Sequence, residues 1–531
     1  MACVIEFVKE FTMSKAEKDS LYLLIKSMTK AEKRNFKLYA NRISTGGQAK
    51  FIRLFDLIDQ QKELDEETLL QKESAIKRSQ LSNLKAHLYR QILTSLRLSH
   101  VQYNADIEIR EQLDYARILY NKGLYTQSQK MLERIKARAE KEHRYTLHLE
   151  ILEFEKFVEL QYITASTQGK EGRAEQLTQH IEQVGQNVLM SNRFSNLALS
   201  LYGLYLKVGH ARNRGDYHLV KDYFESRLPQ HNPAHLGLLE KIYLYQAKAW
   251  YYYIVQHFSM SYRYAQGWVN LFHWHTELVG QQTDLYVRGL YQLLLAQFKA
   301  RAYNKFTTTL SLLQQLRQNP EVHITENNNI LLFLYTSLGT INKHFLEGSF
   351  TEGVTHLPAI ENELLQLENR IDDHWLLLFN YKMACMYFGA GLNRKAIEHL
   401  NKIINYKDVK VREDIHCFAR ILSLIAHYEL QHVDLLDYQV RTVYRFLAKM
   451  DNLQQVQQEV FKFLRNLSAI LPSDLPNAFV QLKNKLQVAA KDPFERRPFM
   501  YLDIISWLES KIENLPVQQV IQRKFATNGF D

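Results

Sequence analysis

The feature that most constrains this 531-residue chain is a turn signal that recurs at nearly constant spacing. A glycine followed two positions later by an aromatic residue marks three of the expected turns, and weaker copies put glutamine or arginine in the place of the glycine. The turns are expected at Gly123, Gly215, Gln256, Arg301, Gly348, Gly391 and Gln431. Their separations are 40 to 47 residues, except for one of 92, which predicts a further turn near residue 169. A period of about 44 residues predicts an array of helix hairpins whose core grows by repetition.

Composition favours helices throughout the chain. Nine prolines and nineteen glycines are few for 531 residues, and no long stretch alternates apolar and polar residues as strands do. Aromatic residues make up 12% of the chain, and 31 of them are tyrosines. Such large, half-polar side chains suit the packing of helix pairs. The expected fold class is therefore all-α.

The best-defined hairpin runs from His374 to Leu400. Ala384 and Ala396 are small enough to let two helices approach closely, and Gly391 ends the first of them. A similar set of residues occurs earlier, namely Ala116, Leu119, Gly123, Tyr125, Ser128 and Leu132. Both sets resemble the tetratricopeptide repeat, a family of hairpin arrays that usually bind proteins. The resemblance covers residues 105–450 and implies a right-handed α-solenoid, with longer helices than the family's usual repeat of about 34 residues allows.

Two further stretches carry a second resemblance. Residues 25–40 (IKSMTKAEKRNFKLYA) and 427–447 (HYELQHVDLLDYQVRTVYRFL) are similar to those of a large group of uncharacterised bacterial repeat proteins of bacteroidete type. This resemblance implies no known activity.

We expect three parts: a basic helical domain at 1–100, the repeats at 101–450 and a helical cap at 451–531. The first hundred residues contribute +6 of the net charge of +10. Two capping boxes, Ser14 to Glu17 and Thr29 to Glu32, open helices there. Solenoids need terminal caps with one polar face, and a final helix at about 499–512 suits that role.

The basic domain allows two interpretations. A short helix near 66–73 precedes a long one at about 80–98, and this order could form a helix-turn-helix whose second helix enters a DNA groove. The cations near it are Lys77, Arg78, Lys85, Arg90 and Arg97. The alternative is a basic helical domain that caps the solenoid.

Tetratricopeptide proteins line a concave groove with the first helix of each hairpin, so the resemblance implies candidate partner-binding residues. Aligned on the turns, these are Arg110, Arg117, Tyr120, Tyr205, Arg212, Trp250 and Tyr253. Arg, Tyr and Trp concentrate binding energy in interfaces. The aromatic run from Trp250 to Tyr253 has a second interpretation, in which its rings pack between adjacent repeats. The lysines and asparagines of the family's carboxylate clamp are missing from the best repeat.

No catalytic or cofactor motif is present. The chain lacks a phosphate-binding loop, a Gly-x-Ser-x-Gly elbow and a His-Glu-x-x-His motif. Cys3, Cys385 and Cys417 lack the spacing of a disulfide framework or a zinc site, which indicates a reducing cytoplasm. No apolar run reaches the roughly 20 residues of a membrane span. We therefore expect a cytoplasmic protein without enzyme activity, cofactor, metal or membrane contact.

The sequence predicts a helical-repeat scaffold that binds a protein or peptide partner in a concave groove. The alternative is a nucleic-acid-binding regulator in which residues 14–100 contact DNA or RNA and the repeats act as a sensor. The two differ in salt dependence, because neutralising phosphates makes affinity fall steeply with salt.

Overall fold

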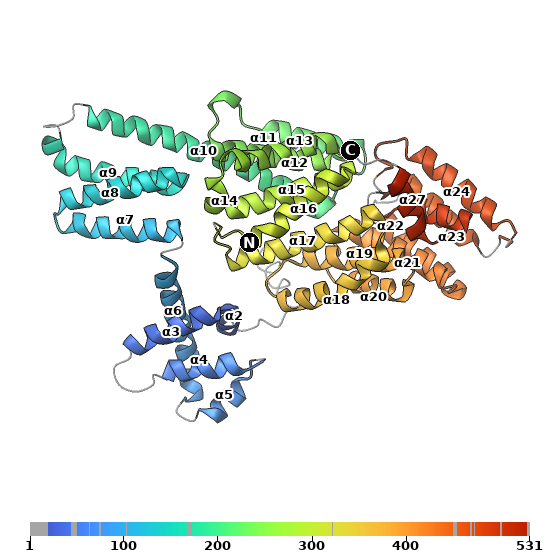
Figure 1. Ribbon diagram of the computed structural model, residues 1–531, viewed down its shortest axis with the longest axis horizontal. Coiled ribbons are helices and arrows are strands. Elements are labelled where there is room, and N and C mark those ends of the chain that lie inside the picture. Colours follow the sequence, from blue (N-terminus) through green and yellow to red (C-terminus); the bar gives the residue numbers. More distant parts are fainter. Residues whose placement is uncertain are drawn as a thin grey trace, which may run out of the picture. The chain divides into compact units, whose positions relative to one another are not determined.

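The structure, a computed structural model, describes most of the chain. The described residues are 20–43, 50–62, 64–73, 76–101, 104–166, 172–320, 322–449, 454–467, 470–471, 473–496, 498–499 and 502–527. Within these ranges the regular structure is helical and contains no strand (Figure 1). The all-α expectation is confirmed for this part of the chain. The capping box at Ser14 and the turn near 169 fall outside the described residues.

The chain divides into two compact units, Met1–Glu182 and Gln183–Asp531, which we call unit 1 and unit 2. The division falls inside one long helix, α10 (Arg173–Val208). The boundaries expected at 100 and 450 do not coincide with it. Each unit is described below by itself.

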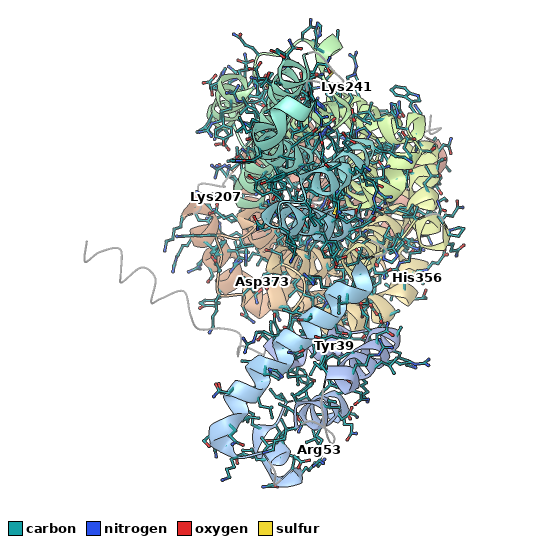
Figure 2. The ribbon with its side chains drawn as sticks, turned by 90° about the vertical axis from the view of Figure 1, so that its left-hand side faces the viewer. Tyr39, Arg53, Lys207, Lys241, His356 and Asp373 are labelled. Atoms are coloured by element: carbon teal, nitrogen blue, oxygen red, sulfur yellow. The ribbon has the colours of Figure 1, made fainter. Side chains whose placement is uncertain are left out.

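Unit 1 begins with a small helical core. Its helices are α2 (Ser20–Ser27), α3 (Lys30–Ile43), α4 (Lys50–Gln60), α5 (Glu66–Lys72) and α6 (Arg78–His100). Phe36, Phe55 and Leu88 are fully buried where these helices meet. Tyr39 of α3, which is labelled in Figure 2, donates a hydrogen bond to Gln91 of α6 across 3.1 Å. Since Thr29 and Glu32 exchange backbone and side-chain hydrogen bonds, the second capping box is confirmed.

Unit 1 continues with α7 (Ala105–Asn121), α8 (Tyr125–Lys141), α9 (Tyr145–Ser166) and the start of α10. The hairpin of α7 and α8 is closed by small residues. Ser128 and Ala116 are both fully buried, and the Ser128 hydroxyl donates to the Ala116 carbonyl across 2.8 Å. Unit 2 repeats this contact between Ser261 and Ala249. Small residues therefore let the paired helices approach closely, as the repeat pattern predicts.

Unit 2 arranges its helices in two series. One series, α12, α15, α17, α19 and α21, makes contacts from each member to the next, and α13, α16, α18, α20 and α22 each pack on the helix that precedes them. The bounds are α11 (Arg214–Arg227), η1 (Pro233–His235), α12 (Leu238–Ile254), α13 (Phe258–Trp274), α14 (Glu277–Gln281), α15 (Thr283–Ala300), α16 (Tyr303–Gln315), η2 (Leu316–Gln318), α17 (Glu326–Glu347), α18 (Phe350–Leu367), α19 (Asp373–Gly389), α20 (Asn393–Ile404), α21 (Glu413–Glu429), α22 (Val433–Lys449), α23 (Gln455–Asn466), α24 (Leu475–Ala489), α26 (Ile504–Glu513) and α27 (Val517–Thr527).

Most of the predicted turns lie where the sequence places them. A residue with positive φ occurs at Gly123, Gln256, Arg301, Gly348, Gly391 and Gln431. Even the three positions without glycine adopt the left-handed conformation. The turn expected at Gly215 is wrong by six residues: the left-handed residue is Gly209, and Gly215 lies in the first turn of α11. The side chain of Asn213 caps that helix and sets its start there.

Gly391 offers a test of the turn conformation. Its φ is +78°, and no neighbouring atom would meet an added Cβ. We expect Gly391→Ala to lower the free energy of unfolding by about 1 kcal/mol, because an L-residue is strained in the left-handed region. The control is Gly203→Ala in α10, which has equally open surroundings and helical φ, and should instead raise stability by about 0.5 to 1 kcal/mol. Chemical denaturation measures both changes in the free energy of unfolding. If the two variants change it in the same direction, the left-handed conformation assigned to Gly391 is wrong.

Candidate ligand cavity

The expected groove residues of unit 1 lie on α7 beside α9. The Arg117 guanidinium donates to a Glu150 carboxylate oxygen across 2.9 Å, and Arg110 contacts the other oxygen at 3.5 Å. Tyr120 packs edge-on against Tyr125 and Phe154. Two of the three residues thus share one glutamate of the neighbouring helix. Their role in binding a partner stays a prediction.

The expected groove residues of unit 2 come together, but inside the protein. Trp250 is 8% exposed and Tyr253 only 2%, and the Tyr205 ring packs on both. Arg212 forms an ion pair with Asp216 at 2.7 Å. Since burial leaves Trp250 and Tyr253 little surface for a partner, their positions favour the packing interpretation of the aromatic run.

Contacts between distant helices fill the inner face of unit 2. The Tyr202 hydroxyl lies 3.4 Å from a ring nitrogen of His374, 172 positions further along the chain. Arg412, which is 2% exposed, forms two hydrogen bonds to the fully buried carboxylate of Asp414, at 2.9 and 2.8 Å. The Arg412 backbone also donates to the Leu206 carbonyl. The surface that a tetratricopeptide groove would leave open is therefore mostly packed in this region, where these residues leave a cavity of only about 80 Å³.

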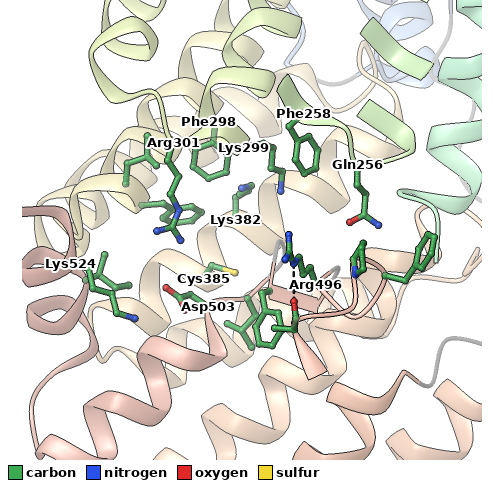
Figure 3. Close-up of a pocket in the computed structure, with 18 of the residues that line it drawn as sticks. Gln256, Phe258, Phe298, Lys299, Arg301, Lys382, Cys385, Arg496, Asp503 and Lys524 are labelled. Atoms are coloured by element: carbon green, nitrogen blue, oxygen red, sulfur yellow. Dashed lines mark hydrogen bonds between the residues drawn. The ribbon is translucent and has the colours of Figure 1, made fainter. Parts of the chain in front are cut away.

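A large cavity lies elsewhere in unit 2, at the edge where the hairpins turn (Figure 3). Its volume is about 1210 Å³. The C-terminal ends of α12, α15, α17 and α19 form one side, and the segment after α24 together with α27 forms the other. We call it the turn-edge cavity. The residues that carry its chemistry are Arg214, Lys299, Arg301, Lys382, Arg496, Lys524, Asp503, Phe258, Phe298, Phe345, Phe350 and Phe388.

Three aromatic residues of the turn signal line this cavity. Tyr217, Phe258 and Phe350 each follow a predicted turn by two positions, and all three belong to the cavity wall. Tyr303, in the equivalent place after Arg301, packs edge-on against Phe525 of the wall. Their recurrence was visible in the sequence, where it indicated turns alone. The same signal could have located the site, because equivalent positions of successive hairpins lie side by side.

Two lysines, one at the end of α15 and one in the middle of α19, are the main chemical feature of the cavity. Lys299 lies at the end of α15 and Lys382 on α19 (Figure 3). The Lys382 ammonium donates to the Asn342 amide oxygen across 2.9 Å and lies about 5 Å from the ring centres of Phe298 and Phe345. Lys299 also lies near the Phe298 ring. These ring contacts favour the ammonium, whereas the loss of hydration in the cavity opposes it.

The rest of the lining adds cations and one carboxylate. Arg214, Arg301 and Arg496 are exposed at the cavity wall. Lys524 is paired with Glu509 at 2.6 Å. Asp503 is the one carboxylate among the described lining residues, and it accepts hydrogen bonds from the backbone and hydroxyl of Ser506 at the start of α26. The lining is therefore strongly cationic.

Burial lowers the pKa of Lys299 to about 7, with a further contribution from the neighbouring charge of Lys382. Burial likewise lowers the pKa of Lys382 to about 8. Both values are below the ordinary 10.5, because the charged forms lose hydration. Burial raises the pKa of the Cys385 thiol to about 11, so it stays protonated and is a poor nucleophile. An anion in this cavity would favour the protonated amines and take up protons as it binds.

The two lysines predict how stability depends on pH. Their folded-state pKa values lie below the unfolded value of 10.5, so their stabilising contribution is complete above pH 10.5 and is lost as pH falls toward 8 and 7. We expect the denaturation midpoint of unit 2 to rise from pH 7 to about 9.5, just below the range in which tyrosines titrate. Chemical denaturation across this range checks the expectation. In the double variant Lys299→Met/Lys382→Met the denaturation midpoint should change less with pH. An unchanged dependence on pH would contradict the lowered pKa values of the two lysines.

The basic helices of unit 1 show ion pairs at the expected DNA-reading end. Arg78, at the start of α6, pairs with Glu67 at 2.8 Å, and Lys85 pairs with Glu66 at 2.6 Å. Both glutamates lie in the first turn of α5. In a helix-turn-helix the N-terminal part of the second helix meets the bases, so acidic residues there oppose the approach of phosphates.

Neither metal-binding geometry, nor membrane-spanning helices, nor known relatives assign a function to the chain. Among the described residues, no group of three or more His, Cys, Asp or Glu side chains is arranged to hold a metal ion. None of the described helices has the length and apolarity that crossing a bilayer requires. No protein-family model, curated protein or solved structure matches the chain.

Proposed function

We propose that this chain is a binding protein whose unit 2 holds an anionic ligand with an apolar body in the turn-edge cavity. The observation that carries the proposal is the imbalance of charge, since the described lining residues include six lysine and arginine side chains, of which Lys524 is paired with Glu509, and one carboxylate. Aromatic rings lie beside two of these charges, those of Lys299 and Lys382. Hydrogen bonds to ionised groups are strongest in such surroundings, so the lining fits an anion that also has apolar surface.

The architecture we infer is a right-handed α-solenoid of tetratricopeptide-like hairpins with helical caps at both ends. The recurrent left-handed turns and the series of contacts from α12 to α21 support it. In this proposal the protein is a cytoplasmic, non-enzymatic scaffold, as the sequence indicates. The proposed binding site lies at the edge where the hairpins turn, whereas the sequence-based prediction places it on the inner faces of the first helices.

The size of the cavity favours a segment of a protein partner as the ligand. Pockets for small molecules usually measure about 300 to 1,000 Å³, whereas this one measures about 1210 Å³. An acidic peptide with aromatic or aliphatic side chains combines the necessary charge and apolar surface. A free organic anion has the same chemistry, and the experiment below separates the two.

The test uses two matched fluorescent probes, anilinonaphthalene sulfonate and its uncharged counterpart N-phenylnaphthylamine. We expect saturable binding of the sulfonate to the folded protein, at least about tenfold tighter than binding of the neutral probe, because a hydrogen bond to a charged group contributes roughly 1.5 to 3 kcal/mol. Equal affinities would mean that the cavity takes apolar ligands without regard to charge. Circular dichroism in the same buffer confirms that the protein stays folded.

Competition then identifies the source of the anion. An acidic, aromatic-containing hexapeptide and dodecanoate are each titrated against the bound sulfonate probe. If the peptide displaces the probe at a lower concentration than dodecanoate does, the ligand is a segment of a protein partner. If dodecanoate alone displaces the probe, the ligand is a free organic anion. Failure of both to displace the probe would contradict the proposal.

The nucleic-acid alternative is less well supported. It depends on cations at the start of α6, and two of them already pair with Glu66 and Glu67. If this alternative holds, the affinity for DNA should fall steeply as salt is raised. The fall should be as steep in a variant whose cavity lysines are replaced by neutral residues.

A further inference from the structure

A second cavity of unit 2 lies between α10 and the C-terminal end of α11. Its volume is about 340 Å³, and it shares no lining residue with the turn-edge cavity. We call it the α10–α11 cavity. Helix α10 contributes Arg193, Asn196 and Ser200 to its wall, and the end of α11 contributes Arg227. The described lining thus contains two arginines and no carboxylate.

The polar residues that α10 contributes lie on one face of the helix. Arg193, Asn196 and Ser200 are spaced by three and then four positions, so they follow one another along the helix surface. Leu197, in the same row, is buried in a cluster against which Leu228 also packs. Both leucines line the cavity. The wall therefore combines an apolar contact between the two helices with a row of polar side chains.

These polar side chains lack partners within the described part of the chain. Arg193, Asn196 and Ser200 make no side-chain hydrogen bond or ion pair there. The Arg227 guanidinium lies 4.3 Å from the ring centre of Tyr223 and pairs with no described carboxylate. A guanidinium can stack on an aromatic face and still present the N–H groups at its edge. The cavity thus offers two guanidinium groups, an amide and a hydroxyl as available hydrogen-bond donors.

We propose that the α10–α11 cavity binds a phosphate monoester. The planar fork of arginine matches the oxygens of phosphate with two parallel hydrogen bonds. Two guanidinium groups balance the charge of about −1.5 to −2 that a phosphate monoester carries at pH 7. The amide of Asn196 and the hydroxyl of Ser200 can donate to the remaining oxygens. The inference does not depend on the turn-edge cavity, because the two sites have no residue in common.

The end of α11 opposes an anion, but only weakly. The carbonyl end of a helix carries about half an elementary negative charge, whereas Arg193 and Arg227 bring two full positive charges. The volume sets the size of the ligand, since about 340 Å³ is near the lower end of the usual range of about 300 to 1,000 Å³ for small-molecule pockets. We therefore expect one phosphate group on a short carbon chain, either a phosphorylated side chain or a small free ester.

The test titrates glycerol 3-phosphate into the full chain by isothermal titration calorimetry, with glycerol as the uncharged counterpart. We expect saturable binding of the phosphate alone. In the double variant Arg193→Gln/Arg227→Gln the affinity should fall at least about tenfold, because hydrogen bonds to two charged groups are lost. The control Arg263→Gln removes an exposed arginine of α13 that lines neither cavity, and should change the affinity less than about twofold. Equal affinities of the double variant and the parent protein would overturn the inference.

Two further titrations locate the phosphate and identify its source. Glycerol 3-phosphate should bind unchanged in excess anilinonaphthalene sulfonate; competition between the two would place the phosphate in the turn-edge cavity and overturn the inference. A phosphoserine hexapeptide is compared with its unphosphorylated form. If it binds more tightly than glycerol 3-phosphate, the ligand is a modified protein, and if more weakly, a free ester. Absence of binding by both phosphates contradicts the proposal. Both arginines are exposed, so the double variant should stay folded, which circular dichroism checks.

Discussion

Replacing Asp414 with asparagine is expected to lower the free energy of unfolding of unit 2 by about 3 to 5 kcal/mol. Asp414 is fully buried and accepts two hydrogen bonds from Arg412, which is itself 2% exposed. The variant leaves the guanidinium buried opposite a neutral amide that can accept only one of those bonds. Removing one partner of a buried ion pair costs far more than the intact pair contributes, because the remaining charge is still desolvated.

Because this pair connects distant helices, the loss of stability in Asp414→Asn should extend through unit 2. The Arg412 backbone donates to Leu206, and its guanidinium lies over the Tyr205 ring. Helix α10 is thereby joined to the start of α21. Chemical denaturation, followed by circular dichroism, measures the change.

A matched control separates burial from charge. Glu326 and Arg370 form an ion pair of similar length, 3.0 Å, with side chains that are 52% and 32% exposed. Glu326→Gln should lower stability by less than about 1 kcal/mol. If Asp414→Asn is no more destabilising than this control, the inner face of unit 2 is hydrated and the packed arrangement is wrong.

Replacing Lys382 with methionine is expected to change binding and stability in opposite directions. Affinity for anilinonaphthalene sulfonate should fall by about 10- to 100-fold, the effect of losing one hydrogen bond to a charged group. Stability at pH 7 should rise or stay constant, since methionine fills a similar volume without a poorly hydrated charge. A lysine that served packing alone would instead give a loss of stability with unchanged binding.

The control for this variant is Lys305→Met, which removes an exposed cation from α16. It should leave the affinity for the sulfonate probe within about twofold, because exposed charges are screened by solvent and salt. A fall in affinity as large as that of Lys382→Met would mean that net charge, not the cavity, attracts the probe.

The turns could be predicted from sequence because a turn is a local property. A residue that ends one helix and starts the next must adopt a particular backbone conformation, and glycine at 123, 348 and 391 shows where. The period then placed Gln256, Arg301 and Gln431 correctly, although their side chains disfavour positive φ. The turn at 215 was misplaced because Asn213 caps a helix that begins before it.

The state of the inner face could not be predicted, because it depends on contacts between distant parts of the chain. The resemblance to tetratricopeptide repeats made an open groove the natural expectation for Trp250 and Tyr253. The first helices of successive hairpins can leave an open groove or pack against one another across it. Which of the two occurs depends on the small rotation of each hairpin relative to the one before, which accumulates over several repeats. The pairing of Tyr202 with His374 is a consequence of that sum, and no local pattern encodes it.

The cavity was missed for a similar reason. Its second wall is the segment that follows α24, together with α27, which returns to pack beside α17. Gly348 marks the contact, since a Cβ there would lie 2.8 Å from the backbone nitrogen of Gln522. Glycine at this position thus serves both the turn and the approach of α27. The sequence indicated the first role through its period and gave no sign of the second.

The most direct measurement is a crystal structure of the full chain grown with anilinonaphthalene sulfonate. The proposed function predicts one bound probe in the turn-edge cavity, with its rings against Phe298 and Phe345 and its sulfonate within hydrogen-bonding distance of Lys382 or of the arginines at 301 and 496. A cavity that holds only water, with the probe seated elsewhere on the protein, would contradict it.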